Sequence, residues 1–310
     1  MQLNYVILVH KNPLQLSRLV KRLSATDVHF YIHIDKAVSS QPFKDILAPY
    51  SNLHFVEEKD RVNITWGDFS MVQATLNIMK MILSEKKSGY CILLSGQDYP
   101  IKSNDYISNF FTKNDGINFI SSKSIPWNHL WYDSGMERIE FYHFHPKKNS
   151  KHNIFIPPIS NKLFYRKRTI KQISRLLISK HFYKIWVIFK KREFPKFMSP
   201  YGGSQWWALP ISTLNLIESY LKNNPEYINF HKYTQVPDEV FFHTLISSKI
   251  SKNLISDKVT YVNWTKGDIF SPANLTFKDL DKIKSIKELF ARKFDETIDS
   301  KILDELDKFY

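Results

Sequence analysis

The chain has 310 residues, 44 Lys and Arg against 30 Asp and Glu, and a formal net charge of +14. With 43% hydrophobic and 15% aromatic residues it can bury a large core, which excludes a disordered chain. The single cysteine, Cys91, excludes a disulfide framework and a cysteine-based zinc site.

The excess positive charge lies in one segment. Residues 147–192 contain 14 Lys and Arg and no acidic residue, so the rest of the chain carries 30 charges of each sign. A nucleic-acid partner is therefore poorly supported by net charge alone, and we expect none. Residues 1–10 lack the basic region and cleavage site of a signal peptide, and no run of 18 apolar residues occurs. These features predict a cytoplasmic protein.

Predicted strands and helices alternate along the first part of the chain. Strands are expected at 5–9, 28–34, 53–56, 90–94 and 117–120, and helices at 13–23, 68–83 and 106–111. This alternation predicts an α/β fold with a mainly parallel sheet flanked by helices. Ligands bind such sheets beyond the carboxyl ends of the strands, which selects His10, residues 33–36 and residues 95–104.

The pattern changes after Pro146. Residues 147–200 are basic, aromatic and interrupted by prolines, and we interpret them as a helical insertion within a single domain of residues 1–310. Strands at 204–209 and 259–262 and helices at 237–246, 283–290 and 296–309 are expected to follow.

Two strand ends carry candidate binding residues. His33 and Asp35 end the second predicted strand, where they could bind a ribose or a uracil edge or simply cap the strand. Asp98 lies in a turn after the buried strand 90–94, where it could face a sugar or cap the amides of the turn.

Two later motifs offer sugar-binding and acid–base groups. Gln205, Trp206 and Trp207 could bind sugar hydroxyls and ring faces, or the two indoles could alternate on a core strand. Pro237 and Asp238 are typical of a helix start. Glu239, beside them, is a candidate general base, because such a base must reach the proton that it removes.

Six blocks in order resemble a known family: residues 33–36 (HIDK), 66–70 (WGDFS), 95–100 (SGQDYP), 203–206 (GSQW), 236–239 (VPDE) and 290–294 (FARKF). They look like the core-2/I-branching β-1,6-N-acetylglucosaminyltransferase family, which also contains the peptide O-xylosyltransferases. The resemblance covers residues 3–297 and suggests a bacterial-type member.

The resemblance implies a GT-A fold and an inverting transfer of GlcNAc, or xylose, from a UDP-sugar without a metal or other cofactor. It makes Glu239 the catalytic base. Donor-side residues would be His10, His33, Asp35, Asp98, Arg292 and Lys293, with Lys293 at the diphosphate, and the sugar or acceptor side would be formed by Gln205, Trp206, Trp207 and Asp238. It also aligns Thr260 with an arginine that serves the family as a second cation at the diphosphate. Lys258, Lys266 or Arg292 would then have to supply that positive charge.

The positions of the aspartates also indicate whether the sequence contains a metal-binding motif. Metal-dependent enzymes of this fold present Asp-x-Asp after a strand, because hard cations need converging oxygens. The only such spacing, Asp279 and Asp281, lies in a predicted helix. This favours stabilisation of the leaving group by cations. Arg292 and Lys293 could supply it, or could instead complement the dipole of a helix end.

The basic segment has several interpretations. Ile170, Ile173, Leu176 and Leu177 recur at helical spacing, with Lys167, Lys171 and Arg175 on another face and aromatics at 182, 183, 186 and 189. Such helices suit an anionic membrane surface, and a glycan or lipid-linked glycan acceptor would fit a peripheral place on the inner face of the cell membrane. Alternatively, the apolar stripe packs on its own domain. For the whole chain, we expect a glycosyltransferase of bacterial surface-polysaccharide synthesis; the alternative is a non-catalytic nucleotide-sugar or carbohydrate-binding protein.

Overall fold

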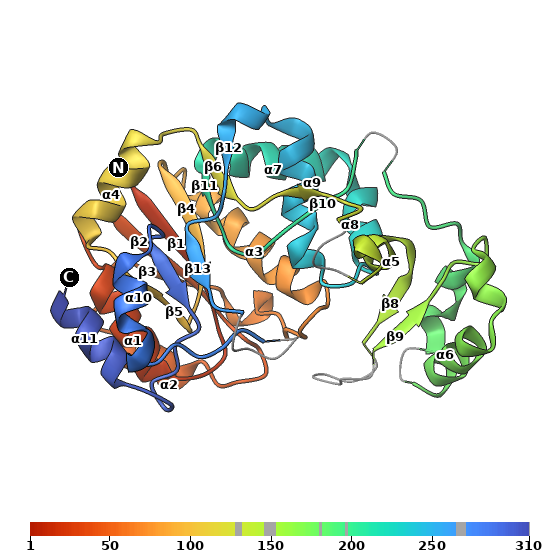
Figure 1. Cartoon of the computed structure of the whole chain (residues 1–310), viewed down its shortest axis with the longest axis horizontal. Helices are drawn as coiled ribbons and strands as arrows, with labels where there is room; N and C mark the ends of the chain where they lie inside the picture. The colour runs from red at the N-terminus through yellow and green to blue at the C-terminus, as the bar shows by residue number, and fades with distance from the viewer. Residues whose placement is uncertain (128–131, 146–152, 180–181, 196–197, 265–270, 310) are drawn as a thin grey trace.

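The computed structural model describes residues 1–309 except 128–131, 146–152, 180–181, 196–197 and 265–270. Its centre is a seven-stranded sheet in the order β12–β6–β11–β4–β1–β2–β3 (Figure 1). Strands β4, β1, β2 and β3 run parallel, whereas β11 is antiparallel to both β4 and β6. The predicted α/β fold with a mainly parallel sheet is confirmed.

The core lies on both faces of this sheet because successive side chains along each strand point to opposite faces. In β1 (Leu3–Val9), every residue is buried; Tyr5 and Ile7 join one apolar cluster, and Val6 and Leu8 join the other. Helices α1, α2, α4, α10 and α11 contribute apolar side chains to the first cluster, and α3, α7 and α9 to the second. Both faces of the sheet are therefore covered, as is typical of parallel sheets.

The remaining elements of the main body have the following bounds. The strands are β2 (Val28–Ile34), β3 (Leu53–Phe55), β4 (Tyr90–Ser95), β5 (Asp98–Pro100), β6 (Asn118–Ile120), β7 (Lys123–Ser124), β10 (Tyr201–Gly202), β11 (Trp207–Pro210), β12 (Ile255–Ser256), β13 (Thr260–Val262) and β14 (Phe290–Arg292). The helices are α1 (Pro13–Leu23), α2 (Gln41–Leu47), α3 (Ser70–Ser84), α4 (Asn104–Lys113), α5 (Met136–Glu140), α7 (Ile211–Asn223), α8 (Pro225–His231), α9 (Phe241–Lys249), α10 (Leu280–Ser285) and α11 (Lys301–Phe309).

A second, three-stranded sheet, β13–β14–β5, joins the end of the chain to the middle. Strand β14 is parallel to β13 and antiparallel to β5, and this register sets Arg292 opposite Asp98. The C-terminal segment therefore lies beside the loop that follows β4.

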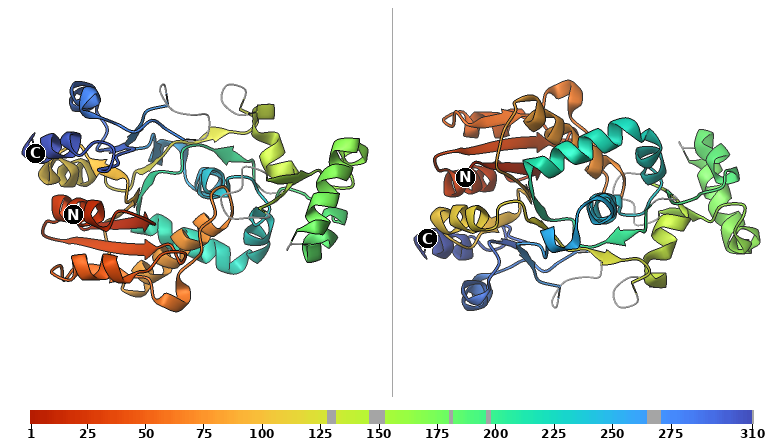
Figure 2. Two further views of the ribbon diagram at one scale, coloured as in Figure 1. Left: turned by 90° about the horizontal axis from the view of Figure 1, so that it is seen from below. Right: turned by 90° about the horizontal axis from the view of Figure 1, so that it is seen from above.

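The basic segment folds into a small lobe at one end of the molecule (Figures 1 and 2). We call β8 (Tyr142–Phe144), β9 (Ile154–Ile156), η3 (Lys162–Tyr165), α6 (Lys167–Ile178) and η4 (Phe182–Phe189) the basic lobe. It has a small apolar core of its own, made by both strands of the β8–β9 hairpin together with Leu176 and Ile188.

Several predicted boundaries were wrong, chiefly near the end of the chain. A helix was expected over 283–290, but α10 ends at Ser285 and Phe290 begins strand β14. Phe290 and Ala291 are fully buried between β13 and β5, so pairing with distant strands overrides the local helical pattern. The expected helix at 237–246 is a 3-10 turn, Pro237–Glu239, followed by α9. In the part of the chain that the structure describes, no helix is long and apolar enough to span a bilayer.

Candidate active site

A cavity of about 400 Å³ opens beyond the carboxyl ends of β1 and β4. Its lining includes residues that directly follow those strands and residues of the C-terminal sheet. Six of the predicted site residues line it: His10, Asp35, Gln205, Trp206, Arg292 and Lys293. His33, Asp98, Trp207, Asp238 and Glu239 are not part of its lining.

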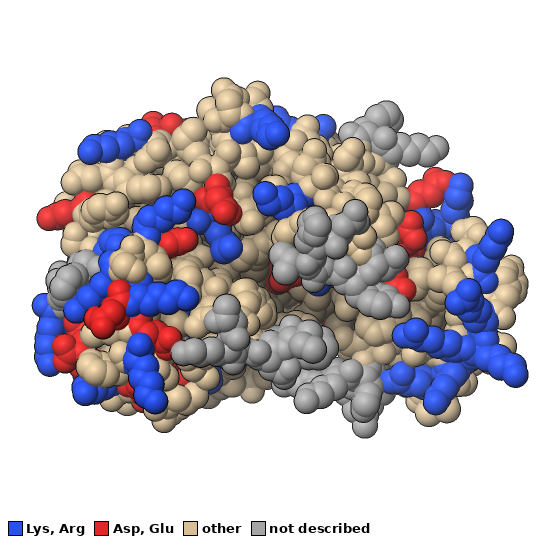
Figure 3. Space-filling model, in the orientation of Figure 1, with Lys and Arg blue, Asp and Glu red and all other residues tan. Residues whose placement is uncertain are grey.

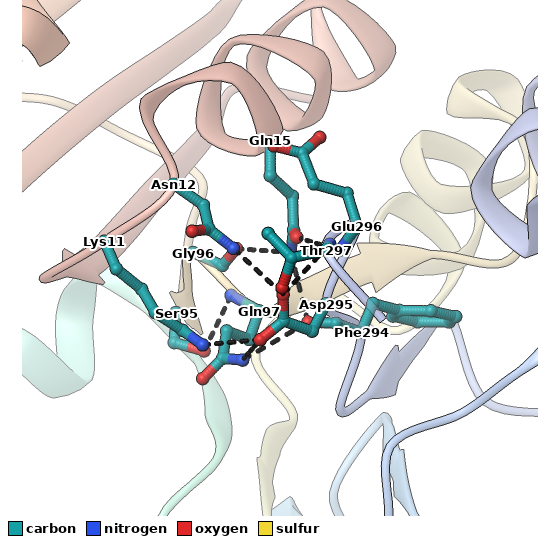
Figure 4. A network of polar contacts seen from close by, with 10 residues as sticks. All are labelled: Lys11, Asn12, Gln15, Ser95, Gly96, Gln97, Phe294, Asp295, Glu296 and Thr297. Carbon is teal, nitrogen blue, oxygen red and sulfur yellow. Dashed lines mark hydrogen bonds and ion pairs between the residues drawn. The ribbon is translucent and has the colours of Figure 1, made fainter. Parts of the chain in front are cut away.

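A polar network ties the loops around this cavity together (Figure 4). The ammonium of Lys11 lies 2.5 Å from Oδ2 of Asp295, and Asn12 donates to Oδ1 of the same carboxylate at 3.1 Å. Gln15 donates to the carbonyl of Gly96 at 2.8 Å and accepts from the backbone amide of Glu296 at 2.9 Å. The segments after β1, β4 and β14 are thereby held together.

Asp295 is the acceptor at the centre of this network. Burial works against its ionisation, but hydrogen bonds from Lys11 and Thr297 outweigh burial and lower its pKa to about 2. The ionised carboxylate therefore anchors the segment that follows Lys293.

Asp98 holds Arg292 in the cavity wall. The Nε of Arg292 lies 3.2 Å from Oδ1 of Asp98, and the guanidinium lies 4.1 Å from the centre of the Trp206 ring. Asp98 is completely buried and also accepts the backbone amide of Ser95 at 2.6 Å. Burial raises the pKa of Asp98, while the nearby Arg292 lowers it. Asp98 does not line the cavity itself, but it holds the side chain of Arg292, which does.

Lys293 is the neighbouring cation. Burial lowers its pKa, and so do the positive charges of Arg292 and Lys11. Three cationic side chains therefore line one cavity. Asp295 and Asp98 balance part of the charge of Lys11 and Arg292, and a bound anion would add to this balance beside Lys293.

The end of β2 is built around a buried arginine. Arg61 donates to the carbonyls of Ile34 at 2.9 Å and Asp35 at 2.8 Å, which fixes the strand end. His33 is fully buried, and its Nε2 accepts the amide of Val62 at 2.8 Å. Burial lowers the pKa of His33 to about 4, so its ring is neutral at pH 7. His33 therefore supports the loop that presents Asp35 to the cavity.

Glu239 lies in a turn that is attached to the cavity wall from two sides. The amide of Gly203 donates to the carbonyl of Glu239 at 3.0 Å, two residues before Gln205. The amide of Val236 donates to the carbonyl of Gly67 at 3.0 Å, next to Trp66 in the lining. The Glu239 turn therefore adjoins the cavity.

The Glu239 carboxylate is itself paired. Its Oε2 lies 2.7 Å from Nη1 of Arg138, and its side chain is 26% exposed. Burial raises the pKa of Glu239, and Arg138 lowers it. Asp238, at 7% exposure, has a pKa raised by burial and then by the charge of Glu239. One of these adjacent carboxyls is thus accessible and the other is enclosed.

Close packing explains the glycine that begins the 203–206 block. A Cβ on Gly203 would lie 1.8 Å from the carbonyl oxygen of Ser121, so only glycine fits there. After it, Trp206 faces the cavity, whereas Trp207 is 1% exposed and packs against Phe242 in the core. Both indoles are buried in the same apolar cluster, but of the two only Trp206 also lines the cavity.

Sequence reasoning did not identify Lys11, Arg61, Trp66 and Arg138 as site residues. Lys11 had a weak signal, because it follows His10 at a strand end. Arg138 had none, because its partner Glu239 lies 101 residues later in the chain.

The remaining candidates for a cation or metal site lie elsewhere. Thr260 is buried opposite Phe290, Lys258 does not line the cavity, and Lys266 lies outside the described residues. Asp279 forms a capping box with Thr276 at a helix start. Among the described residues, no three His, Cys, Asp or Glu side chains come together as metal ligands would.

A family model described as "Branch: Core-2/I-Branching enzyme" matches residues 3–284. The chain belongs to the Core-2/I-branching enzyme family. This confirms the family that the six sequence blocks indicated.

Curated relatives agree with this membership. A xylosyltransferase of Ciona intestinalis and xylosyltransferase 2 of Rattus norvegicus are each 24% identical to the chain, over 327 and 333 residues. Each alignment covers 98% of this chain but 33% of the relative, so the chain spans about a third of their length. Among solved structures, a mannose-1-phosphate geranyltransferase of Thermus thermophilus matches at 10% identity and a TM-score of 0.29, covering 74% of this chain and 64% of that one, which is too distant to inform the site.

Proposed function

We propose that the protein is an inverting glycosyltransferase of GT-A type that transfers GlcNAc, or xylose, from a UDP-sugar to a hydroxyl of a glycan acceptor. The observation that carries this proposal is the cavity with three cationic side chains beside the turn that bears Glu239. Family membership and the xylosyltransferase relatives support a nucleotide-sugar donor.

In this mechanism, Glu239 removes the proton from the acceptor hydroxyl, whose oxygen then attacks the anomeric carbon of the donor. The bond from that carbon to the diphosphate breaks, and the sugar is transferred with inversion. Lys11 and Lys293 neutralise the charge that develops on the departing diphosphate, while Arg292, fixed by Asp98, adds a third positive charge.

Fixed cations of this kind supply the charge stabilisation that a divalent ion supplies in other transferases. Their presence supports a reaction without a metal cofactor. We therefore expect full activity in excess chelator, and a strict requirement for added Mn²⁺ would refute this part of the proposal.

The decisive experiment is Glu239→Gln, with release of UDP from UDP-GlcNAc and UDP-xylose measured in the presence of candidate acceptors. Removing the base should lower kcat by at least about a hundredfold and leave donor affinity unchanged. Glu226→Gln, which changes an exposed carboxylate on α8, is the matched control. Substantial activity in the Glu239 variant would refute the base assignment. Donor binding with no transfer by the wild type to any acceptor would favour a non-catalytic binding protein.

As part of the same proposal, we infer that the acceptor is a bacterial surface polysaccharide or its lipid-linked precursor. Such glycans would be assembled at the cytoplasmic face of the membrane. The abundance of Lys, Ile, Asn and Phe, typical of AT-rich bacterial genomes, supports a bacterial source. Activity on extracted lipid-linked glycans, compared with free oligosaccharides, tests this choice of acceptor.

A further inference from the structure

The basic lobe has two apolar surfaces, and its own core uses one of them. On α6, Leu176 is fully buried against the β8–β9 hairpin, with Ile173 packed partly against the same cluster. On η4, Ile188 is likewise fully buried. Packing of the lobe on itself therefore accounts for one face of α6 and for part of η4.

The other surface is apolar and exposed to solvent. Ile178 is 87% exposed and Trp186 is 73% exposed. Among the described residues, 16 large hydrophobic side chains are exposed, and eight of them lie between residues 165 and 189. Scattered single apolar side chains are ordinary on a protein surface, but such a concentration marks an interaction site.

Helical spacing places these side chains on a common face of α6. Ile170, Leu177 and Ile178 are separated by seven and eight residues, which is about two helical turns. Lys167 and Lys171 are exposed on the same side of the helix. On η4, the rings of Trp186 and Phe189 lie 6.4 Å apart, and both side chains are exposed.

The charge around this surface has one sign. Residues 147–192 carry 14 Lys and Arg and no acidic residue. Figure 3 shows Lys and Arg gathered over the lobe. Arg192 differs from the rest of this group, because its guanidinium turns inward to the carbonyls of Ile139 and Phe230. Exposed aromatic and aliphatic side chains among lysines and arginines match the boundary between lipid headgroups and acyl chains.

Other occupants match this surface less well. A second copy of the chain would bring an equally basic lobe against the first, and the like charges would repel one another. A nucleic acid would satisfy the cations but would leave Ile178 and Leu177 without an apolar partner. An anionic bilayer satisfies both the charges and the apolar side chains.

We propose that the basic lobe binds an anionic lipid bilayer, with the exposed apolar side chains of α6 and η4 inserted among the headgroups. Lys167 and Lys171 bind the lipid phosphates, and the main body of the protein stays in water. This binding is independent of the proposed transferase activity, because it needs neither a donor nor Glu239.

The test is flotation of the full chain with vesicles of phosphatidylcholine alone or with a third of phosphatidylglycerol. We expect binding to the anionic vesicles, with an affinity that falls as salt is raised. Ile178→Ser/Trp186→Ser should weaken this binding by about tenfold or more. Leu14→Ser/Tyr106→Ser, which changes two exposed apolar side chains of the main body, should leave it unchanged.

A charge variant tests the second element of the surface. Lys167→Gln/Lys171→Gln should weaken binding to anionic vesicles by about tenfold, whereas Lys21→Gln/Lys222→Gln, on exposed lysines of the main body, should not. The absence of wild-type binding to anionic vesicles, or equal binding by the Ile178/Trp186 variant, would overturn the proposal. Self-association that is lost in that variant, without vesicle binding, would assign the surface to a second copy instead.

Discussion

Asp98 and Arg292 face each other across the antiparallel strands β5 and β14, with Nε 3.2 Å from Oδ1 and the carboxylate fully enclosed. Asp98→Asn keeps the size of the side chain but leaves the largely enclosed guanidinium of Arg292 without its counter-charge. Because breaking such a pair leaves a charge uncompensated, we expect Asp98→Asn to lower the free energy of unfolding by about 3 kcal/mol. Urea denaturation of the variant and the wild type measures this difference. Asp304→Asn breaks an exposed pair with Arg18 and should cost less than about 1 kcal/mol. Equal losses in the two variants would contradict a structural role for the buried pair.

In the proposed mechanism, the ion pair between Arg138 and Glu239 would set the pH range in which Glu239 can act as the base. Arg138 lowers the pKa of Glu239 against the effect of burial, so Arg138→Met should raise this pKa further. A base acts when it is deprotonated. The acidic limb of the kcat/KM profile should therefore move upward by about one pH unit. Arg18→Met, distant from Glu239, should not move it. An unmoved limb together with lower stability would make Arg138 a purely structural partner.

Gly203 brings the cavity wall against the neighbouring backbone. Gly203→Ala would place a Cβ 1.8 Å from the oxygen of Ser121, so the backbone at this position must shift, and with it the amide that donates to the carbonyl of Glu239. We expect a loss of about 3 kcal/mol or more and little remaining transfer. Gly116→Ala meets no atom within 4 Å but has a φ of +80°, so it should cost only about 1 kcal/mol. Similar unfolding midpoints for the two variants would rule out the close approach as the cause.

Buried histidines should make the fold sensitive to mild acid. Burial lowers the pKa of His243 to about 4 from 6.5, so the unfolded chain takes up a proton at a higher pH than the folded one. The stability due to this neutral ring is complete above pH 6.5 and falls as the pH drops toward 4, by up to about 1.4 kcal/mol per pH unit. His243→Gln keeps a donor for the carbonyl of Ser204 and should flatten this dependence. His29→Gln, at a partly exposed ring, should leave the slope nearly as in the wild type. A curve for His243→Gln as steep as that of the wild type would show that His243 is not responsible.

Local pattern was enough to locate the cavity. Residues 5–9 of β1 form a continuous apolar run that marks a buried strand, and the rule that ligands bind beyond the carboxyl ends of such strands selected His10 and Asp35, which line the cavity. Contacts between distant segments could not be read in this way. Phe290 lies in a stretch with a helical pattern but pairs with β5, and Arg138 gains its role from a partner 101 residues away. The apolar stripe of α6 divides between two faces for the same reason, because the position of the hairpin decides which side is buried.

The contact between Lys11 and Asp295 has a further consequence for how the protein matures. These residues are separated by 284 positions, yet together they hold the loops that line the cavity. The parallel strands can assemble while the chain is still being synthesised, but the cation cluster forms only after residues 290–297 have emerged and docked. Binding of the proposed donor diphosphate should therefore require residues 290–297 to be docked, so that donor binding would report the closure of this long-range contact.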